Sequence, residues 1–371
     1  KYLSIILVGL LALTACQATP AAPSPTAAPA SPSLPQATAT DTEVEAPTVL
    51  NVMTHDSFAV SANLVSDFEA AYHVSVNFIK AGDAGSALNR LILLSLTGAP
   101  EADVFYGLDN TFLSRALEAD VLEAYPAPAL QQIPAEFKLD PGNRALPVDY
   151  GDVCINYDKA YFQQQGIPLP ESLEQLTDPT YYGLLAMENP ATSSPGLSFM
   201  LATIAHFGEG AWLDWWGSMK ENQVVLVSDW ETAYYTNFSG SSGKGAQPMV
   251  ISYASSPVAE VVYASSPLTE APTGALTGDG MCWRQVEFAG IVKGTPHRAL
   301  AEKFIDFMLG QSFQEDMPLQ MFVYPVLSSA QLPAVFSQYS QIPLHPATLD
   351  PQQIAANRDA WVQSWTDLML R

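Results

Sequence analysis

The sequence predicts a two-lobed α/β protein that follows an export signal and a proline-rich tether. Hydrophobic residues make up 48% of the 371 residues, which is ample for a large buried core. Beyond residue 47, short apolar runs typical of strands alternate with apolar residues at helical spacing. This alternation is typical of a parallel sheet covered by helices on both faces, and the length suits two lobes.

The charge balance argues against a nucleic-acid partner. Asp and Glu number 38 against 15 Lys and Arg, so the formal net charge is −23. A nucleic-acid surface needs clustered cations that neutralise phosphates, and so few basic residues do not build one. An acidic protein is instead permissive for a cationic ligand.

Residues 1–16 have the features of a signal peptide. Lys1 precedes the apolar run 3–13, and residues 13–16 are Leu-Thr-Ala-Cys. A charged start, a short apolar run and small residues before a cleavage site are typical of export signals. The run is shorter than the roughly 20 residues of a membrane span. Its ending resembles the bacterial lipobox, which implies lipidation of Cys16 and an extracytoplasmic protein attached to the cell membrane only through that lipid.

Residues 17–47 predict a disordered, extended tether. Proline recurs there among Ala, Ser and Thr, and the segment contains no aromatic residue, Lys or Arg. Such a composition cannot bury a core, so the folded part is expected to begin at residue 48.

The apolar pattern after residue 47 predicts two series of strand–helix units. In the first half, strands are expected at 49–54, 74–79 and 103–106. Each is followed by helically spaced apolar residues: Leu64, Phe68 and Tyr72; then Leu88, Leu91 and Leu94; then Phe112, Leu113 and Leu117. In the second half, strands are expected at 184–187, 224–227 and 249–253, with helices beginning near Gly196, Trp230 and Pro257.

Polar residues follow these strands in both halves, at the strand ends where open α/β sheets bind ligands. They are His55, Asp56, Ser57, Asp83, Asp109 and Asn110 in the first half, and Thr192, Ser193, Ser194, Ser228, Asp229, Ser255 and Ser256 in the second. Helix capping is an alternative role for each, because Ser, Thr, Asp and Asn are preferred N-caps. Facing strand ends would create a cleft shared by the two lobes.

The common catalytic and metal-binding motifs are missing from the sequence. It contains no His-Glu-x-x-His, no Cys-x-x-Cys and no Gly-x-Ser-x-Gly. We therefore predict no catalytic residue, no metal site and no cofactor, and favour a binding protein. An anchored surface enzyme is the alternative from another functional class.

Several short segments occur in a distinctive order from about residue 49 to the C-terminus. They are Thr54-His55-Asp56-Ser57-Phe58, Gly107-Leu108-Asp109-Asn110, Val148-Asp149-Tyr150-Gly151, Ala191-Thr192-Ser193-Ser194-Pro195-Gly196, Trp230-Glu231-Thr232-Ala233-Tyr234, Ser252-Tyr253-Ala254-Ser255-Ser256-Pro257, Gln285-Val286-Glu287 and Tyr324-Pro325-Val326. The series resembles the substrate-binding lipoproteins of bacterial thiamine ABC transporters.

This resemblance implies a periplasmic-binding-protein-like fold of type II, whose two lobes are joined by two crossing strands that act as a hinge. The crossings are expected near 148–157 and 281–292. The first lobe would comprise 48–148 and 285–371, the latter with a C-terminal helix, and the second lobe 149–284. The implied protein is the solute-binding component of an ABC importer, with the membrane permease as its partner.

The resemblance and the strand ends together predict a small-molecule site. Thiamine combines a thiazolium cation with a flat aminopyrimidine, which aromatic faces and carboxylates suit. The site is expected to contain His55, Asp56, Ser57, Asp83, Asp109, Thr192, Ser193, Ser194, Trp230, Tyr253 and Phe322. Trp230 and Tyr253 are implied to enclose the ligand, and the helix start at Ser193 suits a hydroxyl or phosphate tail.

Some positions depart from the family pattern. His55 stands where the family commonly has a tyrosine, Phe322 replaces a tryptophan, and Ala62 and Ala259 stand where aromatics can occur. Thiamine, a thiamine phosphate and another pyrimidine or cation therefore remain open as ligands.

Two other ligands are alternatives. The adjacent Tyr234 and Tyr235 resemble the phenolate pair of iron-binding relatives, although Tyr234 also lies one helical turn after Trp230 and can pack on it. A polyamine would suit the many carboxylates.

Two cysteines, Cys154 and Cys282, remain after Cys16. Both fall on the implied crossings, and an exported protein can hold a disulfide. We predict that they pair; two buried free thiols are the alternative.

Overall fold

The sheet contains eleven strands in a mixed arrangement. In this computed structural model its main path runs β2-β1-β3-β10-β5-β8-β6-β7, while β4 pairs with β10, and β9 and β11 pair with β5. The strands are β1 (Thr48–Thr54), β2 (Val74–Lys80), β3 (Val104–Asp109), β4 (Leu122–Glu123), β5 (Leu146–Asp158), β6 (Leu185–Glu188), β7 (Val225–Val227), β8 (Met249–Tyr253), β9 (Thr273–Leu276), β10 (Trp283–Val292) and β11 (Tyr324–Pro325).

The structure describes residues 47–98, 100–242 and 244–371. The expected signal peptide with Cys16, and the tether up to residue 46, lie outside the described residues. Residues 47–371 form one compact unit, so the lobe boundaries at 148 and 284 stay a prediction.

The expectation of a parallel sheet holds only within each half. Strands β1, β2 and β3 are parallel to one another and form the first half-sheet, and β6, β7 and β8 are parallel and form the second. Between them, β10 is antiparallel to both β3 and β5, and β5 is antiparallel to β8. The pattern of short apolar runs could not reveal this, because it reports burial and not strand direction.

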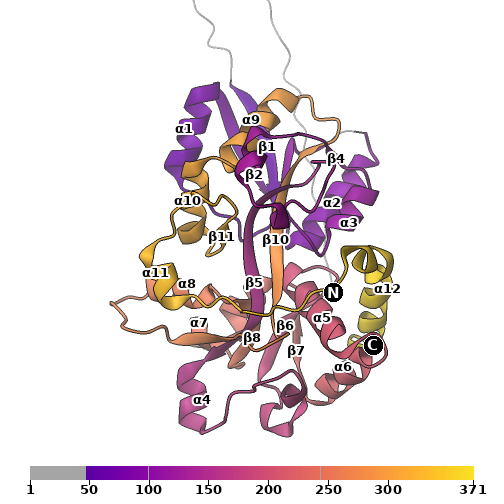
Figure 1. Cartoon of the computed structure of the whole chain (residues 1–371), viewed down its shortest axis with the longest axis vertical. Helices are drawn as coiled ribbons and strands as arrows, with labels where there is room; N and C mark the ends of the chain where they lie inside the picture. The colour runs from indigo at the N-terminus through magenta and orange to yellow at the C-terminus, as the bar shows by residue number, and fades with distance from the viewer. Residues whose placement is uncertain (1–46, 99, 243) are drawn as a thin grey trace, which may run out of the picture. The chain divides into compact units, whose positions relative to one another are not determined.

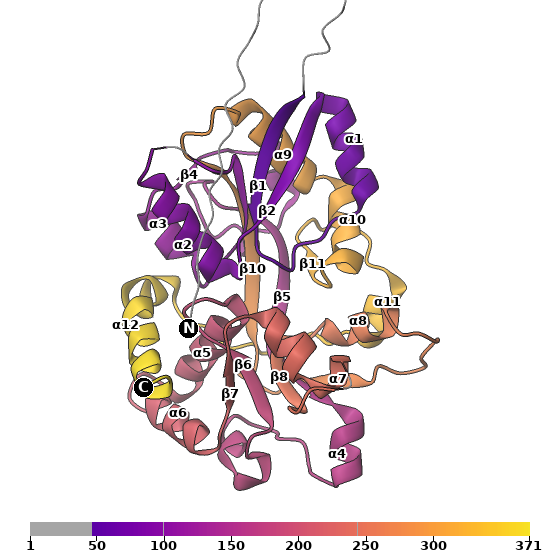
Figure 2. The ribbon, with the colours of Figure 1, turned by 180° about the vertical axis from the view of Figure 1, so that it is seen from behind.

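Two long central strands connect the half-sheets. The views from both sides show β5 and β10 running next to each other through the middle of the unit, from the first half-sheet to the second (Figures 1 and 2). They correspond to the crossings implied at 148–157 and 281–292. Each half-sheet thus presents its strand ends toward the region where these two strands pass.

Both neighbours of β10 bulge at the same level. In β3, Gly107 is the extra residue between the partners of Phe288 and Ala289, and in β5 Val148 is the extra residue beside Glu287. Gly107 has φ +101°, a conformation that residues with a Cβ rarely adopt. The bulges fix which side chains of the crossing strands face the middle of the molecule.

Helices cover the sheet and connect its strands. They are α1 (Ala62–Tyr72), α2 (Ala84–Ser95), α3 (Leu113–Glu118), α4 (Lys159–Gln165), α5 (Ser194–Phe207), α6 (Trp212–Glu221), a π-helix (Thr232–Asn237), α7 (Ser239–Ser242), α8 (Ser256–Val262), α9 (Arg298–Met308), α10 (Gln311–Gln320), α11 (Ala334–Tyr339) and α12 (Pro351–Met369). Four short 3₁₀ turns occur at Pro128–Gln132, Ala135–Phe137, Glu174–Thr177 and Pro179–Tyr181.

The C-terminal helix ties the two halves together. In α12, Trp365 packs edge-to-face on Trp216 of α6, with ring centroids 5.5 Å apart. About two turns earlier in the same helix, the Arg358 guanidinium lies 4.6 Å from the centroid of the Phe112 ring, and Phe112 follows β3. The helix therefore contacts elements that lie on either side of the crossing strands.

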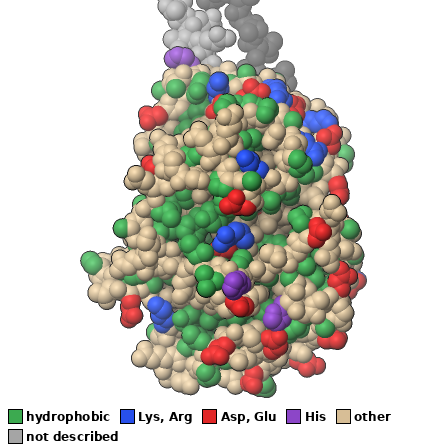
Figure 3. Space-filling model, viewed as in Figure 1, with side chains coloured by type: hydrophobic (Ala, Val, Ile, Leu, Met, Phe, Trp, Pro, Cys, Tyr) green, Lys and Arg blue, Asp and Glu red, His purple; other side chains and the backbone are tan. Residues whose placement is uncertain are grey.

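Surface charge and hydropathy agree with the composition. On the face drawn in Figure 3, acidic side chains occur from top to bottom, and most of the Lys and Arg side chains lie in the upper part with acidic side chains among them. Over the ranges that the structure describes, every helix is too short or too polar to cross a membrane.

Candidate functional site

A pocket of about 310 Å³ lies where the strand ends of both half-sheets meet. Its lining comes from the segments after β1, β2, β7 and β8, from the starts of α2, α5 and α8, from β10 and from the segment after α10. The lining residues are His55, Asp56, Ser57, Phe58, Ala59, Lys80, Asp83, Ala84, Ser194, Pro195, Trp230, Glu231, Tyr234, Tyr235, Tyr253, Ser256, Ala259, Tyr263, Glu287, Gln320, Met321, Phe322 and Val323.

Most of the residues expected at the site line this pocket. His55, Asp56, Ser57, Asp83, Ser194, Trp230, Tyr253 and Phe322 do so, whereas Asp109, Thr192 and Ser193 do not. These last three serve the surrounding structure instead. Asp109 is fully buried and accepts hydrogen bonds from Thr111. The carbonyl of Thr192 accepts a hydrogen bond from a backbone N–H of α2. Ser193 is the N-cap residue of α5.

Trp230 forms one aromatic wall and begins a helical turn, as predicted. Its ring stacks on Tyr234 with centroids 5.1 Å apart, and its Nε1 donates a 3.0 Å hydrogen bond to Ser252 Oγ. Tyr235 meets the same ring edge-to-face at 5.4 Å. The packing of Tyr234 on Trp230 and the position of Trp230 in the pocket therefore occur together.

Tyr253 forms another part of the aromatic lining. Gly151 of β5 leaves room for it, since a Cβ at that position would lie 2.8 Å from Tyr253 Cδ1. The Tyr253 hydroxyl accepts a 3.0 Å hydrogen bond from Gln285 Nε2. The ring is thus fixed against both crossing strands.

Asp83 links the two halves of the pocket. It precedes α2, yet its Oδ2 accepts a 3.0 Å hydrogen bond from the backbone N–H of Trp230, which belongs to the second half. Burial raises the pKa of Asp83 to about 6. This carboxyl therefore titrates close to neutral pH.

Two further contacts join the two halves. The backbone N–H of Gly85 in α2 donates a 3.0 Å hydrogen bond to the carbonyl of Thr192, next to the start of α5. Ser194 Oγ donates to Asp109 at the end of β3. The loops of the first and second half-sheets are consequently in direct contact beside the pocket.

The floor of the pocket contains His55 and Glu287. His55 Nε2 lies 3.6 Å from Glu287 Oε1, and both side chains are almost completely buried. Burial lowers the pKa of His55 to about 3, and nearby Lys80 acts in the same direction. Burial also raises the pKa of Glu287 well above its usual range, so the two groups meet in their uncharged forms.

Several pocket residues were not expected from the sequence. Glu287 and Glu231 lie in segments that carry the family resemblance but were not predicted as site residues, and neither were Tyr263 and Lys80. Lys80 Nζ donates a 2.6 Å hydrogen bond to the carbonyl of Phe58 and another to that of Asp56. A charged residue directly after the predicted strand 74–79 was the available signal for Lys80.

Tyr234 and Tyr235 both pack on Trp230, and Tyr234 also has a carboxylate partner. Tyr234 donates a 2.7 Å hydrogen bond to Glu260 Oε1. Burial raises the pKa of both Tyr234 and Tyr235, which opposes the phenolate form that binds a metal. Among the described residues, no group of three or more His, Cys, Asp and Glu side chains is placed to hold a metal ion.

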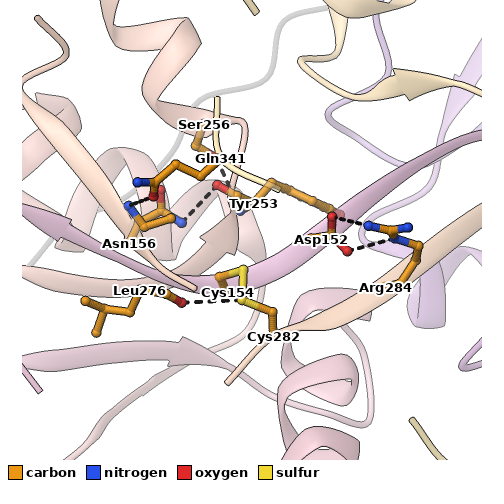
Figure 4. Close-up of a disulfide and its surroundings, with 10 residues drawn as sticks. Asp152, Cys154, Asn156, Tyr253, Ser256, Leu276, Cys282, Arg284 and Gln341 are labelled. Carbon is orange, nitrogen blue, oxygen red and sulfur yellow. Dashed lines mark hydrogen bonds and ion pairs between the residues drawn. A yellow bond between two sulfur atoms is a disulfide. The ribbon is translucent and has the colours of Figure 1, made fainter. Parts of the chain in front are cut away.

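A disulfide joins the two crossing segments. Cys154 of β5 and Cys282, just before β10, are bonded with their Cα atoms 4.4 Å apart (Figure 4). Next to it, Arg284 Nε and Nη2 each donate a 2.8 Å hydrogen bond to Asp152. Two cross-links, one covalent and one ionic, therefore fix β5 against β10.

Comparisons with known proteins identify relatives. A family model described as "Bacterial extracellular solute-binding protein" matches residues 99–343. A thiamine-binding periplasmic protein of Salmonella typhimurium is 30% identical over 331 residues, which cover 86% of this chain and 93% of the relative. A solved periplasmic thiamin binding protein superposes with a TM-score of 0.77 at 27% identity, covering 88% of this chain and 97% of that one.

An iron uptake protein of Synechocystis is more distant, at 22% identity over 359 residues, or 93% of this chain and 90% of the relative. The resemblance to bacterial thiamine-binding proteins is therefore confirmed, and so is the α/β fold of periplasmic binding proteins.

Proposed function

The chain belongs to the family of bacterial extracellular solute-binding proteins, and from that premise we propose that it captures thiamine or a thiamine phosphate for an ABC importer. The observation that carries the proposal is the pocket, in which aromatic rings and carboxyl groups of both half-sheets surround a space of about 310 Å³. Relatives that cover most of the chain are solute-binding proteins and not enzymes.

The lining suits a flat heterocycle with a positive charge. Trp230 and Tyr253 supply faces for ring stacking and cation–π contact, which contributes about 0.5–2 kcal/mol when the cation is desolvated. Asp56, Asp83 and other carboxyl groups supply negative charge. The volume lies in the range of small-molecule sites, at about 300–1,000 Å³.

The phosphate forms of thiamine have less support. Lys80 is the basic side chain among the described pocket-lining residues, and its ammonium already donates to two backbone carbonyls. The start of α5 at Ser194 remains the place where a hydroxyl or phosphate tail would meet free backbone N–H groups. We favour unphosphorylated thiamine on this balance of charges.

The chain would deliver its ligand from outside the cytoplasm. The signal-like residues 1–16 and the family support export. Lipidation at Cys16 would hold the folded unit near the membrane, and the permease of the importer would be its protein partner. Labelling cells with a palmitate analogue tests the anchor, because replacing Cys16 by Ala should abolish incorporation.

Intrinsic fluorescence titration of the purified protein tests the ligand. We expect thiamine to quench Trp230 saturably, with tighter binding than thiamine phosphate, spermidine or ferric citrate. Saturation by ferric citrate or spermidine without any response to thiamine would refute the proposal and favour the iron or polyamine alternative.

A further inference from the structure

Three acidic side chains lie in one row across the centre of the sheet. Glu287 of β10 pairs with Asp109 of β3 on one side and with Asp149 of β5 on the other. Their exposed fractions are 5%, 0% and 1%, respectively. None of the ion pairs between described residues joins a Lys or Arg to this row. Three buried like charges this close are unfavourable, so protons must remain on the row.

The outer two members of the row already have hydrogen-bond donors. Asp109 accepts from the backbone N–H and the hydroxyl of Thr111, at 2.6 and 2.5 Å. Asp149 accepts from the Tyr106 hydroxyl at 2.6 Å. These donors stabilise charge on the outer carboxylates. Glu287 is therefore the member of the row where a proton is best placed.

Glu287 is also the member of the row that lines the pocket. Its Oε2 lies 3.1 Å from the Tyr106 hydroxyl oxygen, and because that hydroxyl is closer to Asp149, at 2.6 Å, its single proton is best placed toward Asp149. A proton on Oε2 satisfies that contact and leaves Oε1 as an uncharged acceptor. Burial, and after it the charge of Asp149, raise the pKa of Glu287, as expected for such an arrangement.

His55 completes the floor beside this acceptor. Its Nε2 is buried, has no hydrogen-bond partner, and lies 3.6 Å from Glu287 Oε1. The His55 ring packs directly against the backbone of Gly107, since a Cβ there would come within 2.5 Å of His55 Cδ2. In the tautomer with a proton on Nε2, the floor presents one donor and one acceptor side by side.

We propose that His55 and Glu287 form an uncharged donor–acceptor pair that recognises the adjacent ring nitrogen and amino group of a heterocyclic ligand. The inference rests on the proposed function and deepens it, because the aminopyrimidine of thiamine carries such an edge. The ring nitrogen would accept from His55 Nε2, and the amino group would donate to Glu287 Oε1. The cation of the ligand is then left to the aromatic and acidic wall around Trp230 and Asp83.

Two variants of nearly equal size separate hydrogen bonding from charge. Glu287→Gln keeps a carbonyl acceptor and gives an N–H₂ donor toward the Tyr106 hydroxyl oxygen, so the dissociation constant for thiamine should stay within about threefold of the wild type. Glu287→Met keeps the length and loses the acceptor, so the constant should rise about tenfold. Both variants should fold. Glu287→Gln should melt like the wild type, and Glu287→Met should melt earlier, because it leaves the Tyr106 hydroxyl oxygen without a donor.

A thiazolium salt without the pyrimidine is the matched control ligand. Both variants should bind it as the wild type does, because Glu287 does not serve the cation. If Glu287→Gln loses as much thiamine affinity as Glu287→Met, Glu287 acts through its charge and the proposal is wrong. Unchanged thiamine binding by Glu287→Met would overturn it equally, because no hydrogen bond would then depend on this side chain.

Calorimetry in buffers of different ionisation enthalpy gives an independent readout. Tyr106, Asp109, Asp149, His55 and Tyr253 are the titratable groups around Glu287. The wild type and Glu287→Gln should release the same number of protons on binding thiamine, since Glu287 keeps its proton. A release that only the wild type shows would assign a charged role to Glu287.

The failure of the proposed function has a different signature. If the wild type does not bind thiamine at all, that function is wrong. The same variants are then compared with 4-amino-2,5-dimethylpyrimidine as the probe. A wild type and Glu287→Gln that bind this probe, together with a Glu287→Met that does not, would still uphold the pair, and any other pattern would overturn it.

Discussion

Trp230 is held in place by one ring contact and two hydrogen bonds. Its ring stacks on Tyr234, its indole N–H is bound by Ser252, and its backbone N–H is bound by Asp83. The ring is nevertheless half-buried and faces the pocket. Such a ring is held rigidly while one part stays free for a ligand, which lowers the entropy cost of binding.

Trp230→Ala should therefore weaken binding far more than stability. We expect the dissociation constant for thiamine to rise at least tenfold, equivalent to about 1.4 kcal/mol, with a small change in melting temperature. Fluorescence cannot report this variant directly, so calorimetry measures binding and circular dichroism measures melting.

Trp216→Ala is the contrasting control. Trp216 is fully buried and packs on Trp365, so its loss should cost about 3–5 kcal/mol of stability. If Trp230→Ala melts as early as Trp216→Ala, Trp230 serves mainly as a core residue.

Asp83 predicts a pH dependence of binding. Its pKa of about 6 exceeds the usual value near 3.9, so the folded protein binds this proton more tightly than the unfolded chain does. The cost of burying the charge is present above pH 6 and is relieved as the pH falls from 6 to 4. A bound cation favours the carboxylate, so affinity for thiamine should fall by up to about tenfold between pH 7.5 and pH 5.

Asp83→Asn keeps an acceptor for the Trp230 N–H and removes the titration. Calorimetry at several pH values should give a flatter profile for this variant. An equally steep profile would assign the pH dependence to another group, such as Asp149, whose pKa burial also raises to about 6.

The residues of the site could be predicted only in part. Strand ends and the family resemblance pointed to Trp230 and Tyr253, which line the pocket. They also pointed to Asp109, which does not line the pocket. Its carboxylate accepts a hydrogen bond from the backbone N–H of Thr111 instead. Glu287 could not be ranked from sequence, because its exposure to the pocket depends on bulges in two other strands.

Among the elements, β5 and β10 depend on each other through the disulfide. Cys154 and Cys282 are 128 residues apart, so the bond closes a long loop in the unfolded chain. In the chain-entropy model such a loop contributes up to about 5 kcal/mol. The double variant Cys154→Ala, Cys282→Ala should therefore melt markedly earlier in a thermal scan.

Mass spectrometry of the unreduced protein checks the bond itself. We expect no alkylation of Cys154 or Cys282 before reduction and alkylation of both after it. Two alkylated thiols in the unreduced protein would show that they are free, the alternative left open by the sequence.

The elements that the sequence predicted are those with a local signature. Strand β8 has the predicted limits, and β1 and β2 extend the predicted ranges by one residue at one end. The short β4, β9 and β11 were not predicted from the sequence, and each forms by pairing with β10 or β5. The direction of β10 depends on partners far away in sequence, so only the resemblance indicated a crossing.

For the molecule as a whole, the contacts beside the pocket predict closure around the ligand. Asp83 and Trp230 are joined across the two half-sheets, as are Gly85 and Thr192. A ligand that touches both sides stabilises the form in which these contacts exist. Thiamine should thus reduce the radius of gyration of residues 47–371 in X-ray scattering, and an unchanged radius despite confirmed binding would indicate a site that is already closed.

Gly85→Ala tests the same closure from within the protein. A Cβ at Gly85 would lie 2.8 Å from the Thr192 carbonyl oxygen across the half-sheets and 2.7 Å from the Phe112 ring. Alanine otherwise favours a helix, so the variant should fold, remain more open and bind thiamine at least tenfold more weakly. Gly217→Ala is the control, because Gly217 lies in α6 with no atom within 4 Å of an added Cβ. It should bind thiamine like the wild type and contract to the same radius. If Gly85→Ala contracts just as fully, approach of α2 to Thr192 is not required for closure.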